Sequence, residues 1–357
     1  MRFKNAGFFV LIFILLSGCS RISTETMVSI KKDKWYINGK ITNEGSPAEG
    51  LLMNVRMVNA VFEDRGDKLP EEFQDFNPEK NSDNFIDEIP EYTSSGVNAF
   101  TIGLQGGMPG YEGAINSAFE GDGKLRPDYM QRVERVIREA DNNSGVIILS
   151  CFYQRQHSHS GMLYSREDIL NAVENTVNWI KTNRFGNVLL EISNEFMHNG
   201  FLYWGAGKWL VSIKGQVELI EYAKSLNPKL LVSTSGMGSG QMPDSIIQVA
   251  DFVTIHFNTT SLEKYGERIN ALKRSGKPII CNEDDKTGKE GAAALALSVL
   301  NGCSWGYMNN QKNQYMPFLF EGVKDDTLVY DLMKKVSTPG YKIDEGFYST
   351  YRENDKF

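Results

Sequence analysis

The sequence predicts an α/β chain that folds as a single (β/α)8 barrel. Eight short apolar runs recur along the chain, and amphipathic segments with helical spacing lie between them. Together they occupy roughly 290 residues, which suits a barrel whose usual size is about 250. The chain has no internal repeat and no low-complexity tract, so we expect one domain.

The eight apolar runs are interpreted as strands. Several are nearly continuous in Val, Ile, Leu and Phe, which is typical of parallel strands that are buried on both faces. The predicted strands are residues 51–58, 97–104, 145–152, 187–194, 230–235, 252–258, 278–283 and 303–308.

The segments between these runs have the start and stop signals of helices. Pro127 stands near the start of "RPDYMQRVERVIREA", and Ser165 stands three residues before Asp168, the spacing of a capping box. Gly276 follows the last periodic residue of "SLEKYGERINALKRSG". Segment 62–95, rich in Asp, Glu and Pro, is expected to be an extended loop. A doubly wound open sheet is the alternative fold, but the chain lacks the glycine-rich dinucleotide turn such sheets usually carry.

The N-terminus has the layout of an export signal. Arg2 and Lys4 precede an apolar run at 6–16 that is too short to span a bilayer comfortably, and Leu-Ser-Gly leads to Cys19. This resembles the lipobox of bacterial lipoproteins, which implies lipidation at Cys19 and anchoring to the bacterial cell envelope, at the outer membrane or cell surface. We therefore expect a signal peptide at 1–18, a polar spacer at 19–33, the barrel at 34–337 and a polar tail at 338–357. Asn38-Gly39 predicts a β-hairpin at the start of the folded part.

Charge and cysteine content exclude several classes of function. Removing Arg2 and Lys4 with the leader would change the formal net charge from −7 to about −9, which argues against a nucleic-acid partner. Cys151, Cys281 and Cys303 lie in separate predicted strands, so buried, inert thiols are expected and no zinc site or disulfide framework. No cofactor is expected, and oligomeric state is not indicated.

Two glutamates stand where an active site would form. Active sites of (β/α)8 barrels gather at the carboxyl ends of the strands. Glu195 ends the fourth predicted strand and Glu283 the seventh, on opposite sides of the ring. Strand alternation places Glu191 deeper inside, where we expect it to pair with a buried donor such as Arg56, and it places Cys281 on the same side as Glu283.

The order of these residues resembles the clan of retaining glycoside hydrolases that includes the family 5 cellulases and mannanases. The resemblance covers about 46–335 and rests on "NVLLEISNEF", "FVTIHFN", "PIICNE" and "CSWGYM". It implies a retaining hydrolase acting on an oligo- or polysaccharide. Carried over by position, it implies Glu195 as acid/base and Glu283 as nucleophile; it also implies substrate contacts from three residues, Asn194, His256 and Trp305.

The chain departs from this family at two positions. The family usually has an arginine at the end of the second strand, whereas the nearest arginine here is Arg56 in the first. The residue after His256 is Phe257, where a tyrosine is common, and Tyr153 or Tyr307 are expected to serve instead. Other expected substrate contacts are Arg56, Gln105 and Trp204, with Trp209 assigned to packing.

Two other functions remain open on the sequence. One is a barrel lipoprotein that binds glycan without cleaving it. The other is a metal-dependent hydrolase, suggested by His157 and His159 in "QRQHSHSG", although these are better explained as part of a substrate-contacting loop because the chain has only four histidines.

Overall fold

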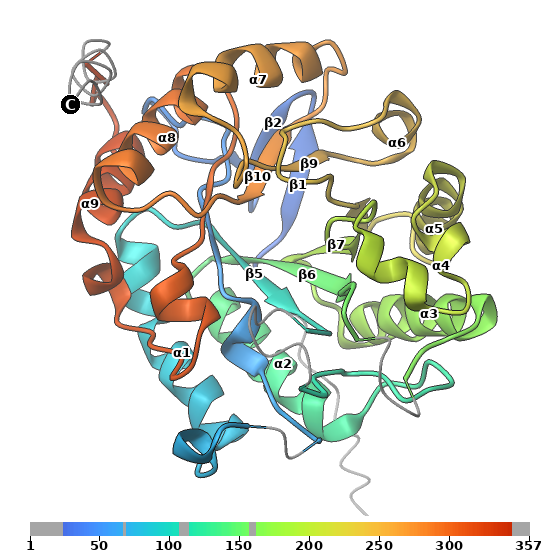
Figure 1. Cartoon of the computed structure of the whole chain (residues 1–357). Coiled ribbons are helices and arrows are strands. Elements are labelled where there is room, and N and C mark those ends of the chain that lie inside the picture. Colours follow the sequence, from blue (N-terminus) through green and yellow to red (C-terminus); the bar gives the residue numbers. More distant parts are fainter. Residues whose placement is uncertain (1–23, 67–68, 107–113, 157–161, 345–357) are drawn as a thin grey trace, which may run out of the picture.

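The chain forms a ring of strands surrounded by helices (Figure 1). A computed structural model describes residues 24–66, 69–106, 114–156 and 162–344. Within these ranges the barrel strands are β4 (Asn54–Arg56), β5 (Ala99–Gly103), β6 (Val146–Phe152), β7 (Val188–Ser193), β8 (Leu231–Ser233), β9 (Val253–His256), β10 (Ile279–Glu283) and β11 (Gly306–Tyr307). Each lies inside, or differs by a residue or two from, a run predicted as a strand.

All neighbouring strands of the ring are parallel. Six pair in the order β11-β4-β5-β6-β7-β8, and β9 pairs with β10. Single parallel bridges join Ser235 to Thr254 and Ile280 to Ser304, which connect β9 and β10 to the two ends of the six-stranded sheet. The ring is therefore closed, and the predicted (β/α)8 barrel is confirmed.

Helices pack around the outside of this ring. Their positions follow the predicted alternation with strands, because apolar residues at helical spacing face the sheet. The helices are α1 (Pro78–Ser94), α2 (Pro127–Asn142), α3 (Arg166–Asn183), α4 (Gly207–Leu210), α5 (Ile213–Leu226), α6 (Asp244–Val249), α7 (Tyr265–Lys273), α8 (Gly288–Leu300) and α9 (Thr327–Val336). Short helices of other types are η1 (Val58–Val61), η2 (Glu71–Phe73), η3 (Asn199–Tyr203), η4 (Leu262–Lys264), η5 (Asn310–Gln314) and η6 (Gly322–Asp325).

The local signals for helix ends are confirmed, but one helix was missed. Pro127 is the first residue of α2, and Ser165 forms a complete capping box with Asp168 at the start of α3. The expectation that 62–95 is an extended loop was wrong, because 78–94 form α1. Its buried face is narrow, with Phe85 and Tyr92 on it, and the many acidic residues and two prolines obscure that pattern in the sequence.

An N-terminal three-stranded sheet closes the bottom of the barrel. It consists of β1 (Val28–Lys31), β2 (Lys34–Ile37) and β3 (Lys40–Ile41), with Asn38-Gly39 at the predicted turn, both at positive φ. The predicted spacer at 19–33 was therefore too long, since 28–31 form β1. Trp35 is fully buried and packs edge-to-face on Phe252, so it plugs the apolar lower layer of the barrel.

The barrel wall contains the three expected buried thiols. Cys151, Cys281 and Cys303 are free and fully buried, and burial raises the pKa of Cys151 and Cys303 to about 12. Among the described residues, no helix has the length and apolar character needed to span a membrane.

Candidate active site

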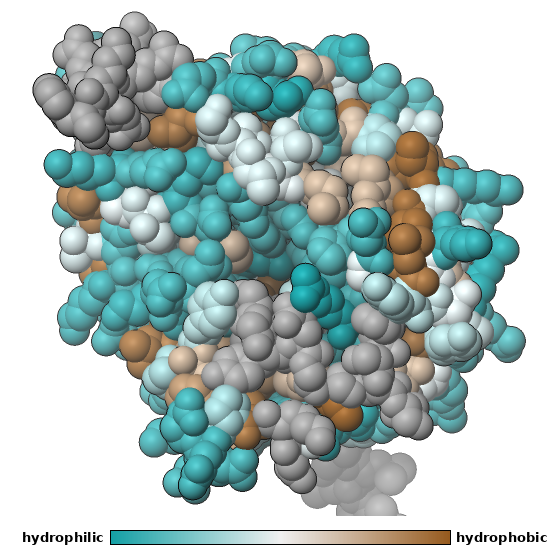
Figure 2. All heavy atoms as spheres, viewed as in Figure 1, coloured by the Kyte–Doolittle hydropathy of each residue, from teal (hydrophilic) through white to brown (hydrophobic). Residues whose placement is uncertain are grey.

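Glu195 and Glu283 meet at the carboxyl ends of the barrel strands, as their positions in the sequence predict. Glu195 follows β7 and Glu283 ends β10. One carboxylate oxygen from each, together with one ring nitrogen of His256, lies within 4.8 Å of the others. This face of the molecule is hollowed near its centre and is largely hydrophilic around the hollow (Figure 2).

The backbone at Glu195 departs from strand geometry. Glu195 has a φ of 47°, in the left-handed region that non-glycine residues rarely adopt. The hydroxyl of Ser235 accepts a hydrogen bond of 2.9 Å from the Glu195 backbone N–H. Because the chain leaves the strand here, the consecutive residues Asn194 and Glu195 both line the same pocket. A strained backbone at a rim carboxylate is typical of a functional site.

A register shift places Glu283 in the pocket as well. The pairing of β10 with β9 is irregular between Cys281 and Glu283. Cys281 packs in the outer core, Asn282 reaches the barrel interior, and Glu283 turns into the pocket. The expectation that Cys281 and Glu283 share a side was therefore wrong, because a β-bulge breaks the alternation on which it rested.

Both oxygens of Glu283 have polar partners. Arg56 Nε lies 2.9 Å from Oε2, and the Asn258 amide donates a short hydrogen bond to Oε1. Burial acts to raise the pKa of Glu283, but the charges of Arg56 and His256 and the hydrogen bond from Asn258 outweigh it. The pKa of Glu283 therefore lies below its ordinary value, and the side chain is held ionised.

His256 lies between the two carboxylates. Its Nδ1 is 3.4 Å from Glu195 Oε1 and 3.6 Å from Glu283 Oε2, and the side chain is fully buried. Burial acts to lower the pKa of His256, whereas the nearby carboxylates raise it and prevail. Nδ1 of the buried ring thus lies close to one oxygen of each acid.

Arg56 contacts residues at the rim of the barrel, and it does not pair with Glu191 in the interior. Besides Glu283, it donates a 2.9 Å hydrogen bond from Nη2 to the side-chain oxygen of Asn194. The predicted pairing of Glu191 with Arg56 was wrong: Glu191 is fully buried, but its partner is Asn282, at 3.4 Å. The second oxygen of Glu191 has no hydrogen-bond partner among the described residues. Arg56 is the last residue of β4, and its two partners, Glu283 and Asn194, both line the pocket at the strand ends.

The carboxylates open into a pocket of about 220 Å³. Amides dominate its remaining wall, with Gln154, Asn258, Asn310 and Gln314 beside Tyr153, Asp285, Met308 and Tyr315. Asp285 is a third carboxylate there, and burial together with the charges of Asp284 and Glu283 raises the pKa of Asp285. A wall of amides and two tyrosine rings offers many hydrogen-bond donors and acceptors to a neutral hydroxylated ligand.

Five predicted substrate contacts do not line this pocket, and the fully buried His256 is one of them. Trp305 is fully buried and its Nε1 donates to Asp284 at 2.8 Å, while the hydroxyl of Tyr307 donates to Asp326. Trp204 is buried against Phe152 and Phe201, so it packs, whereas Trp209 stacks with Arg166 and is partly exposed. Gln105 is buried and donates to Ser117. In each case the side chain lies under the rim, a depth that strand position alone does not reveal.

Tyr153 does line the pocket, so of the two tyrosines expected near the nucleophile it is the one in reach. Phe257, which replaces the usual tyrosine, stacks on Tyr265 with ring centroids 4.1 Å apart and is buried. His198 caps η3 by accepting the Gly200 N–H. Cys19, His157 and His159 lie outside the described residues.

Sequence reasoning missed several residues of the pocket. Asn258 ends the predicted strand 252–258, and Asp285 follows the predicted strand 278–283 by two residues, so their rim positions were a usable signal. Gln314 and Tyr315 come from the segment after β11, in and next to η5, and nothing local in the sequence connects them to the carboxylates.

The two carboxylates and His256 are also of the residue types that bind divalent metals. Two features of the site oppose a metal. Both oxygens of Glu283 already accept from Arg56 and Asn258, and the Arg56 guanidinium would repel a cation placed beside Glu283.

Comparison with known proteins identifies the fold through solved structures at 11–13% sequence identity. No family model and no curated protein matches the chain. Solved structures do match. The endo-1,4-β-mannanase of Rhizomucor miehei has a TM-score of 0.60 and 12% identity, covering 87% of this chain and 99% of that one. The β-mannanase of the blue mussel Mytilus edulis has a TM-score of 0.55 and 11% identity, covering 88% and 98%.

A third similar structure contains a sugar. The family 5 glycoside hydrolase of Prevotella bryantii, in complex with a xyloglucan tetradecasaccharide, has a TM-score of 0.57 and 12% identity, covering 84% of this chain and 99% of that one. The chain thus has the (β/α)8 fold of family 5 glycoside hydrolases, at a sequence distance that marks it as divergent from them.

Proposed function

We propose that the protein is a retaining glycoside hydrolase that cleaves a neutral oligo- or polysaccharide. The observation that carries the proposal is the approach of Glu195 and Glu283, whose nearest oxygens lie within 4.8 Å. Retaining enzymes hold their two carboxyl groups about 5–5.5 Å apart, whereas inverting enzymes need about 6.5–9.5 Å to fit a water. The fold that the chain shares with mannanases and endoglucanases supports the same class.

The ionised Glu283 is suited to act as the nucleophile. Its carboxylate would attack the anomeric carbon while Glu195 transfers a proton to the leaving glycosidic oxygen, which breaks the glycosidic bond and forms a glycosyl ester on Glu283. Glu195 would then accept a proton from water as that water attacks the same carbon and releases Glu283 as a carboxylate. Arg56 and Asn258 stabilise Glu283 in the ionised form, so they favour its departure in the second step.

Charge at the site favours a neutral substrate. Three carboxylates line the pocket, from Glu195, Glu283 and Asp285, and the guanidinium of Arg56 is already engaged by Glu283 and Asn194. An acidic sugar would therefore place its charge beside these acidic groups, and the one cation among the described lining residues, Arg56, is already paired with Glu283. A neutral glycan meets amides and the ring of Tyr315 instead.

A substrate panel with product analysis tests this proposal. Purified protein is incubated with neutral glucans, mannans and xyloglucan, and with acidic polysaccharides, and the reducing ends formed are measured. The proposal predicts release from at least one neutral substrate and its loss in Glu283→Gln. Binding of a glycan by the unmodified protein without any release would favour a non-catalytic glycan receptor.

A metal-dependent hydrolase is the second candidate, because Glu195, His256 and Glu283 converge. Metal analysis of the purified protein and activity after treatment with a chelator separate the two. A stoichiometric metal whose removal abolishes hydrolysis would support the metal reading.

We further propose that the protein is a lipid-anchored lipoprotein of the cell envelope. The support is the sequence before the barrel, an apolar run followed by Leu-Ser-Gly-Cys19. Detergent-phase partitioning of the full chain and of Cys19→Ala, produced in bacterial cells, tests it. Equal partitioning of the two proteins would contradict a lipid at Cys19.

A further inference from the structure

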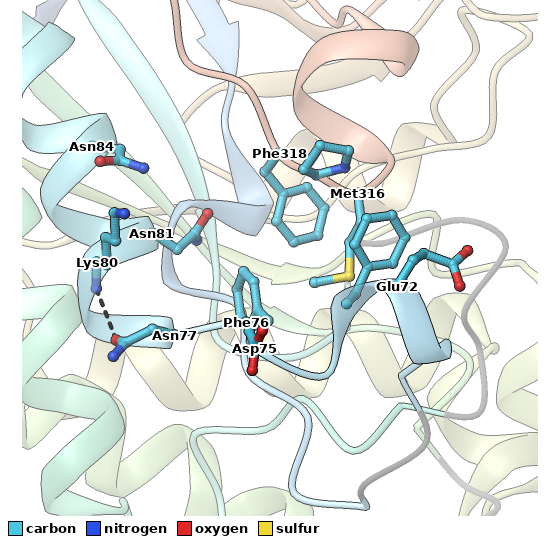
Figure 3. Close-up of a pocket in the computed structure, with 11 residues that line it drawn as sticks. Glu72, Asp75, Phe76, Asn77, Lys80, Asn81, Asn84, Met316 and Phe318 are labelled. Atoms are coloured by element: carbon cyan, nitrogen blue, oxygen red, sulfur yellow. Dashed lines mark hydrogen bonds between the residues drawn. The ribbon is translucent and has the colours of Figure 1, made fainter.

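A second pocket lies beside the catalytic one, on the same loop. It has a volume of about 210 Å³ and is bounded by η2, the start of α1 and the segment after η5 (Figure 3). Gln314 and Tyr315 line the catalytic pocket, and the next three residues, Met316, Pro317 and Phe318, line this one. Four residues span at most about 14 Å, so a chain-like ligand can reach from one pocket to the other.

One side of the second pocket is apolar and rigid. Phe76 and Phe318 meet edge-to-face with centroids 6.0 Å apart, and both pack on the buried ring of Phe62, at 5.7 and 5.2 Å. Phe73 and Met316 extend this surface. A fixed surface of rings and a thioether suits the apolar face of a sugar better than it suits a charged ligand.

The opposite side is a row of polar side chains from the start of α1. Lys80, Asn81 and Asn84 lie there, and the carboxamide of Asn81 points toward Phe318 (Figure 3). Glu72 and Asp75 also line the pocket, so two carboxylates accompany its one cation among the described lining residues, Lys80. Amide, ammonium and carboxylate groups above an apolar floor can hydrogen-bond several hydroxyls of one ligand.

Asn59 of η1 forms hydrogen bonds with both sides of the pocket. Its carbonyl accepts a 2.9 Å hydrogen bond from the Asn81 amide, and its own amide donates to the Asn313 carbonyl at 3.2 Å. Gln314 in turn donates to the carbonyl of Arg56 at 3.2 Å, which joins the loop to the strand whose last residue holds Glu283. The pocket is thus preformed and held in register with the active site, which lowers the entropic cost of binding.

We propose that this second pocket binds a distal sugar unit of the same neutral polysaccharide chain that is cleaved between Glu195 and Glu283. The inference rests on the proposed function and adds to it that the substrate is a chain long enough to occupy both pockets. Hydrolysis should therefore become more efficient as the chain lengthens.

The test removes the polar side without touching the packed side. Lys80→Ala/Asn84→Ala alters two exposed residues of α1. The matched control is Asn270→Ala/Lys273→Ala, which removes the same residue types from the exposed surface of α7, outside both pockets. Asn84→Trp, which fills the pocket, is a second probe. Thermal unfolding confirms that all variants fold.

The readout is kcat/KM on a polysaccharide that the unmodified protein cleaves and on a short aryl glycoside. We expect Lys80→Ala/Asn84→Ala and Asn84→Trp to lower kcat/KM on the polysaccharide about tenfold, the effect of losing two ordinary hydrogen bonds, and to leave the aryl glycoside within about twofold. The control should change neither. Equal effects on both substrates, or none on the polysaccharide, would overturn the second pocket and leave the proposed function standing.

If the unmodified protein cleaves nothing, the proposed function fails and the pocket is tested by binding alone. Electrophoresis through gels containing soluble glucan, mannan or xyloglucan then provides the readout. Retardation that is lost in Lys80→Ala/Asn84→Ala supports the pocket. Retardation that is unchanged in this variant, or that is not seen even for the unmodified protein, overturns it.

Discussion

Arg56 Nε lies 2.9 Å from Glu283 Oε2, and both side chains are at least nine-tenths buried. The first barrel strand thus holds the carboxylate of the seventh, and the same guanidinium reaches Asn194 after the fourth.

Replacing Arg56 by Met should destabilise the fold by about 3–5 kcal/mol, because it leaves a buried carboxylate without its cation. Denaturant unfolding measures this loss. Arg65→Met, at a partly exposed arginine, should cost less than about 1 kcal/mol. Equal losses would contradict a special role for Arg56.

The pH dependence of hydrolysis should report the ionisation of Glu283. Because the pKa of Glu283 is lowered, the nucleophile is ionised at neutral pH, and activity falls only as the pH drops through that lowered value. Asn258→Ala removes a hydrogen bond to Glu283, so it should raise the pKa of Glu283 and move the acidic limb of kcat/KM to higher pH. Asn258→Asp should move it further, since a like charge then stands beside the carboxylate. An acidic limb that is the same in all three proteins would rule out Glu283 as the ionising nucleophile.

The lowered pKa of Glu283 also makes the free energy of unfolding depend on pH. A carboxyl whose folded pKa lies below its unfolded value, ordinarily about 4.3, stabilises the fold above that unfolded value. The contribution is lost as the pH falls through the lower, folded value. We therefore expect the unfolding free energy of Glu283→Gln to depend less on pH than that of the unmodified protein between about pH 5 and 2. Chemical unfolding at several pH values measures the two curves, and parallel curves would contradict the shift.

Ser235 should matter for catalysis through the backbone of Glu195. Its hydroxyl accepts the Glu195 N–H at 2.9 Å and supports the left-handed conformation there. Ser235→Ala should lower kcat about fivefold, the effect of about 1 kcal/mol, with little change in KM. Ser233→Ala removes an equally buried hydroxyl, bonded to the Phe252 carbonyl, and should leave kcat unchanged. The prediction fails if both variants lose activity equally.

We expect Trp305 to stabilise the fold and not to bind substrate. Its indole N–H donates to Asp284, which also accepts from the Tyr265 hydroxyl and from Lys286. Trp305→Phe should lower the free energy of unfolding and leave KM within about twofold, because the hydrogen bond is lost while the pocket wall is kept. Tyr315→Ala, at an exposed ring of the pocket, should raise KM without destabilising the fold. A raised KM with no loss of stability in Trp305→Phe would instead show that Trp305 binds substrate.

The sequence predicts the barrel well because its signals are local. Buried parallel strands leave nearly continuous apolar runs, and Pro127 and Ser165 mark helix starts through backbone chemistry that needs no distant partner. Helix α1 was not predicted, because its two prolines and its acidic residues are typical of a loop. Packing against the barrel supplies most of its stability.

The site was predictable only in part, for a related physical reason. Placing Glu195 and Glu283 at facing strand ends required no more than the barrel and its order. The partner of Glu191, the register shift before Glu283 and the depth of Trp305 depend on contacts between strands that are far apart in sequence. Periodicity carries no information on these contacts, and a bulge or a left-handed residue reverses what alternation predicts.

The anomeric configuration of the first-formed product tests the central claim most directly. Proton NMR spectra taken within the first turnovers, before mutarotation, on any neutral glycan that the protein cleaves, give that configuration. The close approach of Glu195 and Glu283 predicts that the product keeps the configuration of the cleaved bond. An inverted product would contradict a glycosyl ester on Glu283, and with it the roles assigned to both carboxylates.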